Sequence, residues 1–120
     1  MKLVIAEKNS VASEIAHCLG AYEKIYGKNG MACYTGNGYY VTNALGHLYD
    51  IGQPPDYGYS DKWTLNELPI LPSEFKIIPK SSSDSSFNKM LTGQRDLISE
   101  LINHPDVDEV VCATDAGREG

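Results

Sequence analysis

The segment "KLVIAEKNSVASEIAHCLG" (Lys2 to Gly20) passes from a short apolar run through a polar turn into an amphipathic stretch. The run Lys2 to Ala6 is rich in β-branched residues and bounded by charge, which is typical of a parallel strand buried on both faces. Asn9 or Ser10 can cap a helix that Gly20 would end. The apolar residues expected on one face of that helix are Val11, Ile15, Cys18 and Leu19. The chain therefore opens with a strand followed by a helix.

Two further segments predict the rest of a sheet. "EVVCAT" (Glu109 to Thr114) is again a short β-branched run and predicts a second buried parallel strand. "MACYTGNGYYVTNAL" (Met31 to Leu45) predicts two strands joined at Gly36, Asn37 and Gly38, residue types that accept positive φ. Together these segments predict an α/β fold, with a mostly parallel sheet flanked by helices and a β-hairpin.

A long helix and an irregular excursion are expected between these strands. "SFNKMLTGQRDLISELINH" (Ser86 to His104) carries apolar residues at helical spacing, with Gly93 as a weak point inside it. The preceding "SSSDSS" (Ser81 to Ser86) is expected to form a solvated loop that caps this helix. From about 49 to 80 the chain holds all but one of its six prolines, which predicts an ordered, irregular insertion. We expect one domain over 1–120, with this insertion at about 49–80.

Composition limits the class of protein and its partners. The 120 residues are 42% hydrophobic, which is enough for a single core. Acidic residues outnumber basic ones by 16 to 10, so no basic field favours nonspecific DNA binding by this piece. Three widely spaced cysteines without metal or disulfide spacing indicate a reducing, cytosolic environment. The first apolar run is too short for a signal peptide or a membrane span, so we expect a soluble, cytoplasmic protein.

Carboxylates follow both predicted parallel strands. In doubly wound sheets, ligands bind outside the carboxyl ends of such strands, where Glu7, Asp115 and then Glu119 stand. If the strands are neighbours, two like charges about 4 Å apart repel by roughly 4 kcal/mol at an effective dielectric constant of 20. A cation or a shared proton would relieve that repulsion, and oxygen ligands without nearby His or Cys favour Mg²⁺. Alternatively, Asp115 caps the next helix and Glu119 complements its dipole.

Three basic residues accompany these carboxylates. Two of them are close to the carboxylates in sequence, and the third follows another predicted strand. Lys8 and Arg118 lie at predicted helix starts, where a cation is unfavourable by about 0.3–1 kcal/mol unless an anion such as a phosphodiester also binds there. An ion pair with Glu7 or Glu119 is the alternative. His47, in "ALGHLYDIG", can bind a phosphate or donate a proton, or else be a packed core residue.

Four motifs occur in order along the chain: "LVIAEKNSVASEIA", "ALGHLYDI", "WTLNELPILPSEF" and "ATDAGREG". Through them, essentially the whole chain resembles the N-terminal Toprim domain of bacterial type IA DNA topoisomerases, most closely the topoisomerase III group. The resemblance implies a Rossmann-like Toprim fold and a Mg²⁺-dependent enzyme. Such an enzyme cuts one DNA strand through a phosphotyrosine link, passes another strand through and reseals the break. The implied substrate is DNA with single-stranded regions, negatively supercoiled or catenated.

The resemblance also implies roles for individual residues. Glu7 matches the family's catalytic glutamate, a general acid for the leaving 3′ oxygen and a metal neighbour, and Lys8 matches the lysine that steadies the scissile phosphate. Asp115 and Glu119 match the ends of the family's Asp-x-Asp-x-Glu motif, in which Gly117 replaces the second aspartate. We therefore expect one Mg²⁺, held by Asp115 with Glu119 or Glu7. The residues expected to contact phosphate or DNA are Lys8, His47 and Arg118.

The family's nucleophilic tyrosine lies in a separate domain, and none of the eight tyrosines here matches it. We therefore expect a fragment of a larger topoisomerase that works with the remaining domains of the same polypeptide and is inactive alone. One alternative is the Toprim module of a primase or nuclease, which should lack the signature at Trp63 and Leu68-Pro69. The other is a nonenzymatic α/β module that binds a cation.

Overall fold

The computed structural model describes residues 1–27 and 29–118. The chain divides into two compact units. Unit 1 comprises Met1–Leu48 together with the chain from Ser81 onward, and unit 2 comprises Tyr49–Lys80. Unit 2 occupies the stretch in which the prolines are concentrated.

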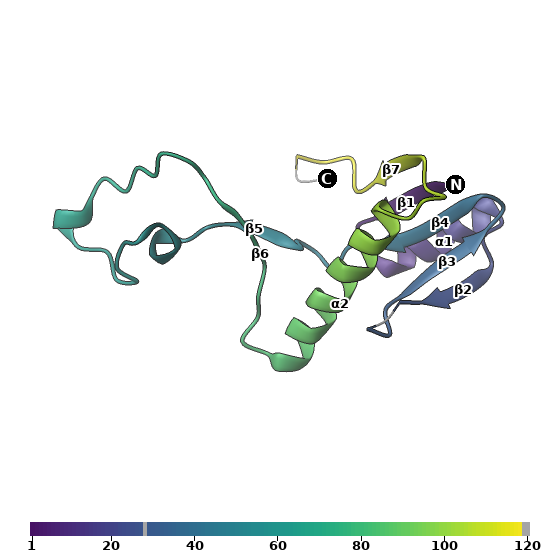
Figure 1. Ribbon diagram of the computed structural model, residues 1–120, viewed down its shortest axis with the longest axis horizontal. Coiled ribbons are helices and arrows are strands. Elements are labelled where there is room, and N and C mark those ends of the chain that lie inside the picture. The colour runs from purple at the N-terminus through teal and green to yellow at the C-terminus, as the bar shows by residue number, and fades with distance from the viewer. Residues whose placement is uncertain (28, 119–120) are drawn as a thin grey trace. The chain divides into compact units, whose positions relative to one another are not determined.

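Unit 1 is built on one mixed sheet with the strand order β2-β3-β4-β1-β7. Its central strand β1 pairs in parallel with both β4 and β7, whereas β3 pairs antiparallel with β2 and β4 (Figure 1). The strands are β1 (Lys2–Ala6), β2 (Glu23–Tyr26), β3 (Ala32–Gly36), β4 (Tyr39–Asn43) and β7 (Glu109–Ala113). The predicted α/β class is confirmed, and both predicted parallel strands pair side by side. The expected burial of the second strand is wrong, because β7 is an edge strand of the sheet and both Val110 and Cys112 are exposed.

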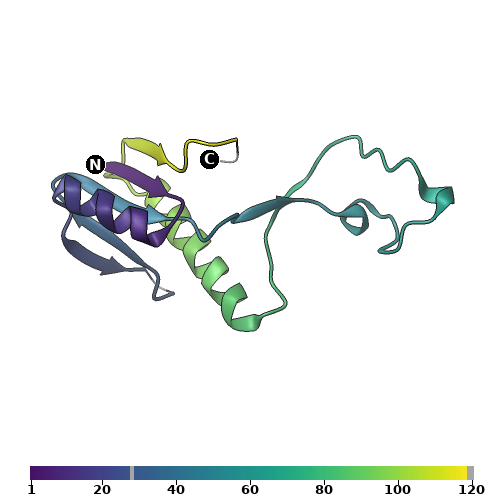
Figure 2. The ribbon, with the colours of Figure 1, turned by 180° about the vertical axis from the view of Figure 1, so that it is seen from behind.

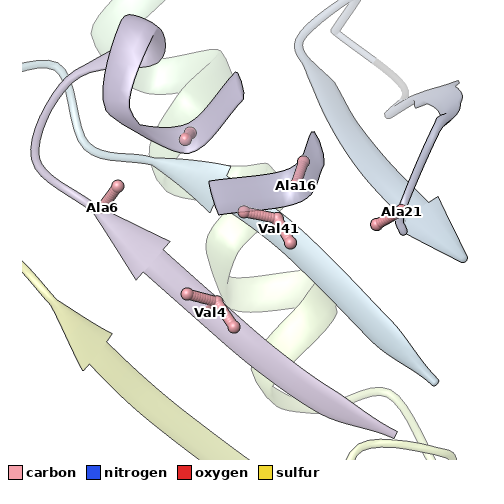
Figure 3. Packing of buried hydrophobic residues seen from close by; sticks show 6 residues of the cluster. Val4, Ala6, Ala16, Ala21 and Val41 are labelled. Atoms are coloured by element: carbon pink, nitrogen blue, oxygen red, sulfur yellow. The ribbon is translucent and has the colours of Figure 1, made fainter. Parts of the chain in front are cut away.

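Two helices cover opposite faces of this sheet, because neighbouring residues of a strand point to opposite sides. Val4 of β1 packs with α1 (Asn9–Leu19), whereas Leu3 packs with α2 (Ser85–Ile102). Figure 2 shows α1 in front of the sheet, on the side away from α2. The core on the α1 side consists of small and β-branched residues (Figure 3): Val4, Ala6, Ala12, Ala16, Ala21 and Val41.

Helix α1 has a different N-cap from the one predicted, but it packs on the sheet largely as predicted. Its N-cap is Lys8, without a side-chain capping hydrogen bond, rather than Asn9 or Ser10. Ala12 and Ala16 are buried, and three of the four residues expected on the apolar face, Val11, Ile15 and Leu19, pack against the same core. The fourth, Cys18, is exposed.

The predicted end of α1 is confirmed. Gly20 adopts the left-handed conformation, with φ of 76°, and its N–H group donates to the carbonyl groups of Ala16 and His17. This arrangement closes the helix and directs the chain towards the edge of the sheet.

Helix α2 follows the prediction closely. Asp84, within the serine-rich loop, accepts a hydrogen bond from the backbone N–H of Phe87 at 3.0 Å and so caps the helix. Gly93, expected to be a weak point, is a point of close approach. A Cβ atom there would lie 3.1 Å from both Asn29 Cβ and Met31 Cγ. The absence of a side chain therefore lets α2 lie close to the segment that precedes β3.

The hairpin between β3 and β4 is also confirmed. Asn37 and Gly38 form its loop with φ values of 49° and 84°, the positive values that a two-residue hairpin requires. The antiparallel strand β2, which pairs with β3, was not predicted. Its four residues, "EKIY", are too few to show a clear alternating pattern.

Unit 2 contains a two-stranded antiparallel sheet of β5 (Tyr49–Ile51) and β6 (Ile77–Pro79), and two 3₁₀ turns, η1 (Pro54–Tyr57) and η2 (Leu65–Glu67). The Glu67 carboxylate accepts hydrogen bonds from the N–H and hydroxyl groups of both Ser60 and Thr64. The Ser60 hydroxyl is the main cause that holds the pKa of Glu67 below its usual value. These bonds order a segment that has little regular secondary structure.

No helix in the described part of the chain is both long and apolar enough to cross a membrane.

Gly36 and Gly38 provide a matched test of the hairpin, because both have positive φ but different surroundings. A Cβ at Gly36 would lie 2.9 Å from the Gly20 carbonyl oxygen and 3.0 Å from Ala21 Cα, whereas one at Gly38 would meet nothing within 4 Å. Replacement by alanine should cost roughly 1–2 kcal/mol at Gly38 from backbone conformation alone. Gly36→Ala should cost a further 1–3 kcal/mol or so because backbone atoms must move. Urea unfolding followed by circular dichroism measures both, and equal losses would contradict the close approach.

Candidate carboxylate site at the strand ends

The register of the parallel strands brings two predicted site residues together. Ala6, the last residue of β1, is level with Asn43 of β4 and Ala113 of β7. The carboxyl ends of three strands therefore lie at one edge of the sheet (Figure 1). Glu7 follows β1 directly, and Asp115 follows β7 after one intervening residue. Two residues more than a hundred positions apart in sequence therefore lie close together at this edge.

Direct contacts join Glu7, Lys8 and Asp115. The backbone N–H of Asp115 donates to Glu7 Oε2 at 3.4 Å. The Lys8 ammonium nitrogen lies 3.6 Å from Asp115 Oδ2, with the two side chains 64% and 55% exposed. An ion pair this exposed contributes about 0–1 kcal/mol, so competition from another ion or a phosphate would displace it at little cost. The pairing differs from the expected alternative, which joined Lys8 to Glu7 or Glu119.

The third predicted metal ligand, Glu119, lies outside the described residues. Within residues 1–27 and 29–118, no group of three or more His, Cys, Asp or Glu side chains is placed to hold a metal ion. The described site therefore offers two carboxylates: Asp115 is exposed, and Glu7 is partly buried. Two carboxylate ligands match the way Mg²⁺ binds in proteins, where it keeps several waters and completes its shell with substrate phosphate oxygens.

The other two predicted phosphate-binding residues are both exposed. His47 lies on the segment that leaves the carboxyl end of β4, the strand beside β1, and it is not a packed core residue. Arg118 lies three residues beyond Asp115. Each therefore follows a strand that ends at the same edge of the sheet as Glu7.

Gly117 stands in open space. A Cβ atom built there would meet nothing within 4 Å, and its backbone N–H donates to the Asp115 carbonyl at 2.8 Å. The position can therefore accept a side chain without displacing its neighbours. The lack of a carboxylate at this position is a property of the sequence and has no steric cause.

Sequence reasoning missed a buried polar group behind this edge. The Gln94 side chain on α2 donates from Nε2 to Thr42 Oγ1 and to the Asn43 carbonyl oxygen, and all three residues are buried. The sequence carried a signal for it. Gln94 stands three residues after Leu91 and three before Leu97, on the face of the helix that the apolar residues occupy. A polar residue in such a place is expected to have a buried partner.

Comparison with known proteins relates the chain to one group of enzymes. No family model matches it. It is 42% identical over 120 residues to the DNA topoisomerase 3 of Shouchella clausii, a match that covers 99% of this chain and 15% of that protein. It is 42% and 35% identical, each over 119 residues, to the DNA topoisomerase 3 of Staphylococcus saprophyticus and of Bacillus subtilis, covering 98% of this chain and 15% of each protein. The chain thus spans about 15% of the length of the curated relatives it matches.

Proposed function

We propose, from the premise that this chain is homologous to a segment of DNA topoisomerase 3, that it forms the Mg²⁺-binding Toprim part of a type IA topoisomerase. The observation that carries the proposal is an identity of 35–42% over 98–99% of this chain to three proteins of that name. The whole protein would cleave, pass and reseal single DNA strands through a phosphotyrosine whose tyrosine lies outside this chain. Its partners would be DNA and the remaining domains of the same polypeptide, in the cytoplasm.

The carboxylate site supports binding of one Mg²⁺ ion. Glu7 and Asp115 provide hard oxygen atoms at one edge of the sheet, joined through the 3.4 Å contact from the Asp115 N–H to Glu7 Oε2. Asp115 is the principal ligand in this proposal, with Glu119 or Glu7 as the second. When bound, the ion stabilises negative charge on the oxygen atoms of the scissile phosphate.

The chain's own residues supply the proton and the phosphate contacts. Glu7 acts as the general acid that protonates the leaving 3′ oxygen during strand cleavage. Lys8 exchanges its exposed 3.6 Å contact with Asp115 for the phosphodiester, as a compact and mobile ammonium charge can. His47 and Arg118, exposed beyond two neighbouring strand ends, bind flanking phosphates.

Relaxation of negatively supercoiled plasmid by the full-length protein tests the proposed activity. We expect relaxation that requires Mg²⁺ and is lost in Glu7→Gln, because an amide cannot act as the general acid. Asp61→Asn, a change at an exposed carboxylate in unit 2, is the control and should keep wild-type activity. Turnover without divalent metal, or no relaxation under any condition, would rule out the proposed function.

The metal ligands are tested by calorimetric titration of the full-length protein with Mg²⁺. Asp115→Asn should weaken binding at least about tenfold, equivalent to roughly 1.4 kcal/mol, because the principal charged ligand is lost. Asp61→Asn serves again as the matched control and should bind like the wild type. Equal affinities in wild type and Asp115→Asn would show that the ion, if bound, is held elsewhere.

Gly117 allows the site to be strengthened. Gly117→Asp adds a carboxylate in open space close to Asp115 and should tighten Mg²⁺ binding about threefold to tenfold. Gly117→Asn adds a neutral side chain of the same shape and should leave the affinity near that of the wild type. The same titration measures both variants. If the two variants bind equally, position 117 does not face the ion.

A further inference from the structure

Three polar residues are buried together where β4 ends. Thr42 is 1% exposed, Gln94 3% and Asn43 6%, and they are the buried polar residues in the described part of the chain. Buried polar groups are costly unless each finds a partner. No buried side-chain nitrogen or oxygen atom in that part lacks one, so the three form a satisfied cluster.

Gln94 is the donor that joins this cluster to α2. Its Nε2 lies 3.0 Å from Thr42 Oγ1, and it also donates to the backbone carbonyl of Asn43. The Asn43 side chain donates in turn to the Ala44 carbonyl at 2.6 Å. One helix side chain thus fixes the last two residues of a strand, and Asn43 fixes the start of the segment that follows.

The sheet itself does not hold the Asn43 carbonyl. The N–H of Ala44 donates to the Ala6 carbonyl of β1 at 2.8 Å, and the Asn43 carbonyl, in the same trans peptide, points the opposite way, towards β3. Pairing between β3 and β4 ends at the Tyr34–Val41 pair, so β3 offers this carbonyl no ladder partner. The Gln94 side-chain amide supplies the hydrogen bond that a residue of β3 would otherwise donate to this carbonyl.

This replacement occurs beside the candidate site. Asn43 is level with Ala6, the residue before Glu7, and the segment that begins at Ala44 leads to His47. Loss of the Gln94 donor would leave a buried carbonyl and a buried hydroxyl without their partner. The end of β4 would then shift or open towards water, and the backbone beside Glu7 would lose its fixed neighbour.

We propose that Gln94 is a positioning residue for the strand-end site, which it serves by holding the end of β4 against β1 through Thr42 and Asn43. The inference rests on the proposed function, since the reaction it supports is strand cleavage by Glu7 and Lys8. Gln94 is buried and therefore acts on the site through β4, without contact to DNA.

Two variants of the full-length protein each remove one partner of the hydrogen bond between Gln94 and Thr42. Gln94→Met keeps the length of the side chain without a donor, and Thr42→Val replaces the accepting hydroxyl with a methyl group. Thr42→Ser keeps the hydroxyl and is the conservative rescue. Leu91→Ala, at a fully buried residue one turn earlier on α2, is the control for general loss of core packing.

Kinetics of oligonucleotide cleavage separate positioning from stability. For Gln94→Met and Thr42→Val we expect the single-turnover rate constant for cleavage of a single-stranded oligonucleotide to fall at least about tenfold, with the apparent Kd for the oligonucleotide changed less than about twofold. Thr42→Ser and Leu91→Ala should retain that rate constant within about threefold, measured well below their unfolding temperatures. An unchanged rate constant in Gln94→Met, or an equal fall in Leu91→Ala, would overturn the positioning role.

Hydrogen–deuterium exchange of the same proteins gives a readout independent of activity. Peptides covering 42–48 should exchange faster in Gln94→Met and Thr42→Val, but not in Thr42→Ser or Leu91→Ala. If wild-type protein cleaves no DNA, the proposed function fails, and exchange still decides whether Gln94 holds β4. Unchanged exchange over 42–48 in Gln94→Met would overturn the inference even if DNA cleavage by the wild type is normal.

Discussion

The parallel pairing of β1 with both β4 and β7 is the constraint on which the candidate site depends. Because Ala6 is level with both Asn43 and Ala113, the carboxyl ends of three strands coincide at one edge. A register shift of one residue would turn Leu3 and Val4 to the wrong faces and empty both cores at once. The cores on the two faces of the sheet therefore fix the register, and the register in turn fixes the approach of Glu7 to Asp115.

The electrostatics of this edge favour an exchangeable site. Glu7 accepts a hydrogen bond from the backbone N–H of Asp115, and Asp115 pairs with the ammonium group of Lys8, so each carboxylate has a partner within the chain. Both side chains of the ion pair are more than half exposed, which keeps the contact weak. A divalent ion at Asp115 and a phosphate at Lys8 would replace that pair with two stronger interactions.

Local patterns predicted most of unit 1. The positions of the two β-branched strands, the turn at Asn37 and Gly38 and the capping of α2 by the serine-rich loop all depend on residues close in sequence, and all are confirmed. The errors have a different origin. The N-cap of α1, the exposure of Cys18 and the existence of β2 depend on how the helix and the hairpin meet the rest of the sheet. Such contacts leave only weak traces in a short segment.

The candidate site shows the same division. Glu7 and Asp115 were expected together because strand ends of a parallel sheet share an edge. The partner of Lys8 was not foreseen correctly, since it depends on side-chain reach across the strand ends. The Gln94 cluster joins residues about fifty positions apart in sequence: the helical pattern hints that Gln94 is buried, but only the packing of α2 on β4 identifies its partners. Glu119, expected as a ligand, lies outside the described residues and remains part of the proposal.

The most direct test of the central claim is the position of a bound divalent ion. Crystals of the full-length protein soaked in Mn²⁺, which can replace Mg²⁺ at oxygen ligands, would give an anomalous difference peak for the metal. The account predicts one peak within coordination distance of an Asp115 carboxylate oxygen, with Glu7 or Glu119 as its neighbour. A peak located away from Asp115, or no peak at this edge of the sheet at saturating Mn²⁺, would contradict the proposed metal site.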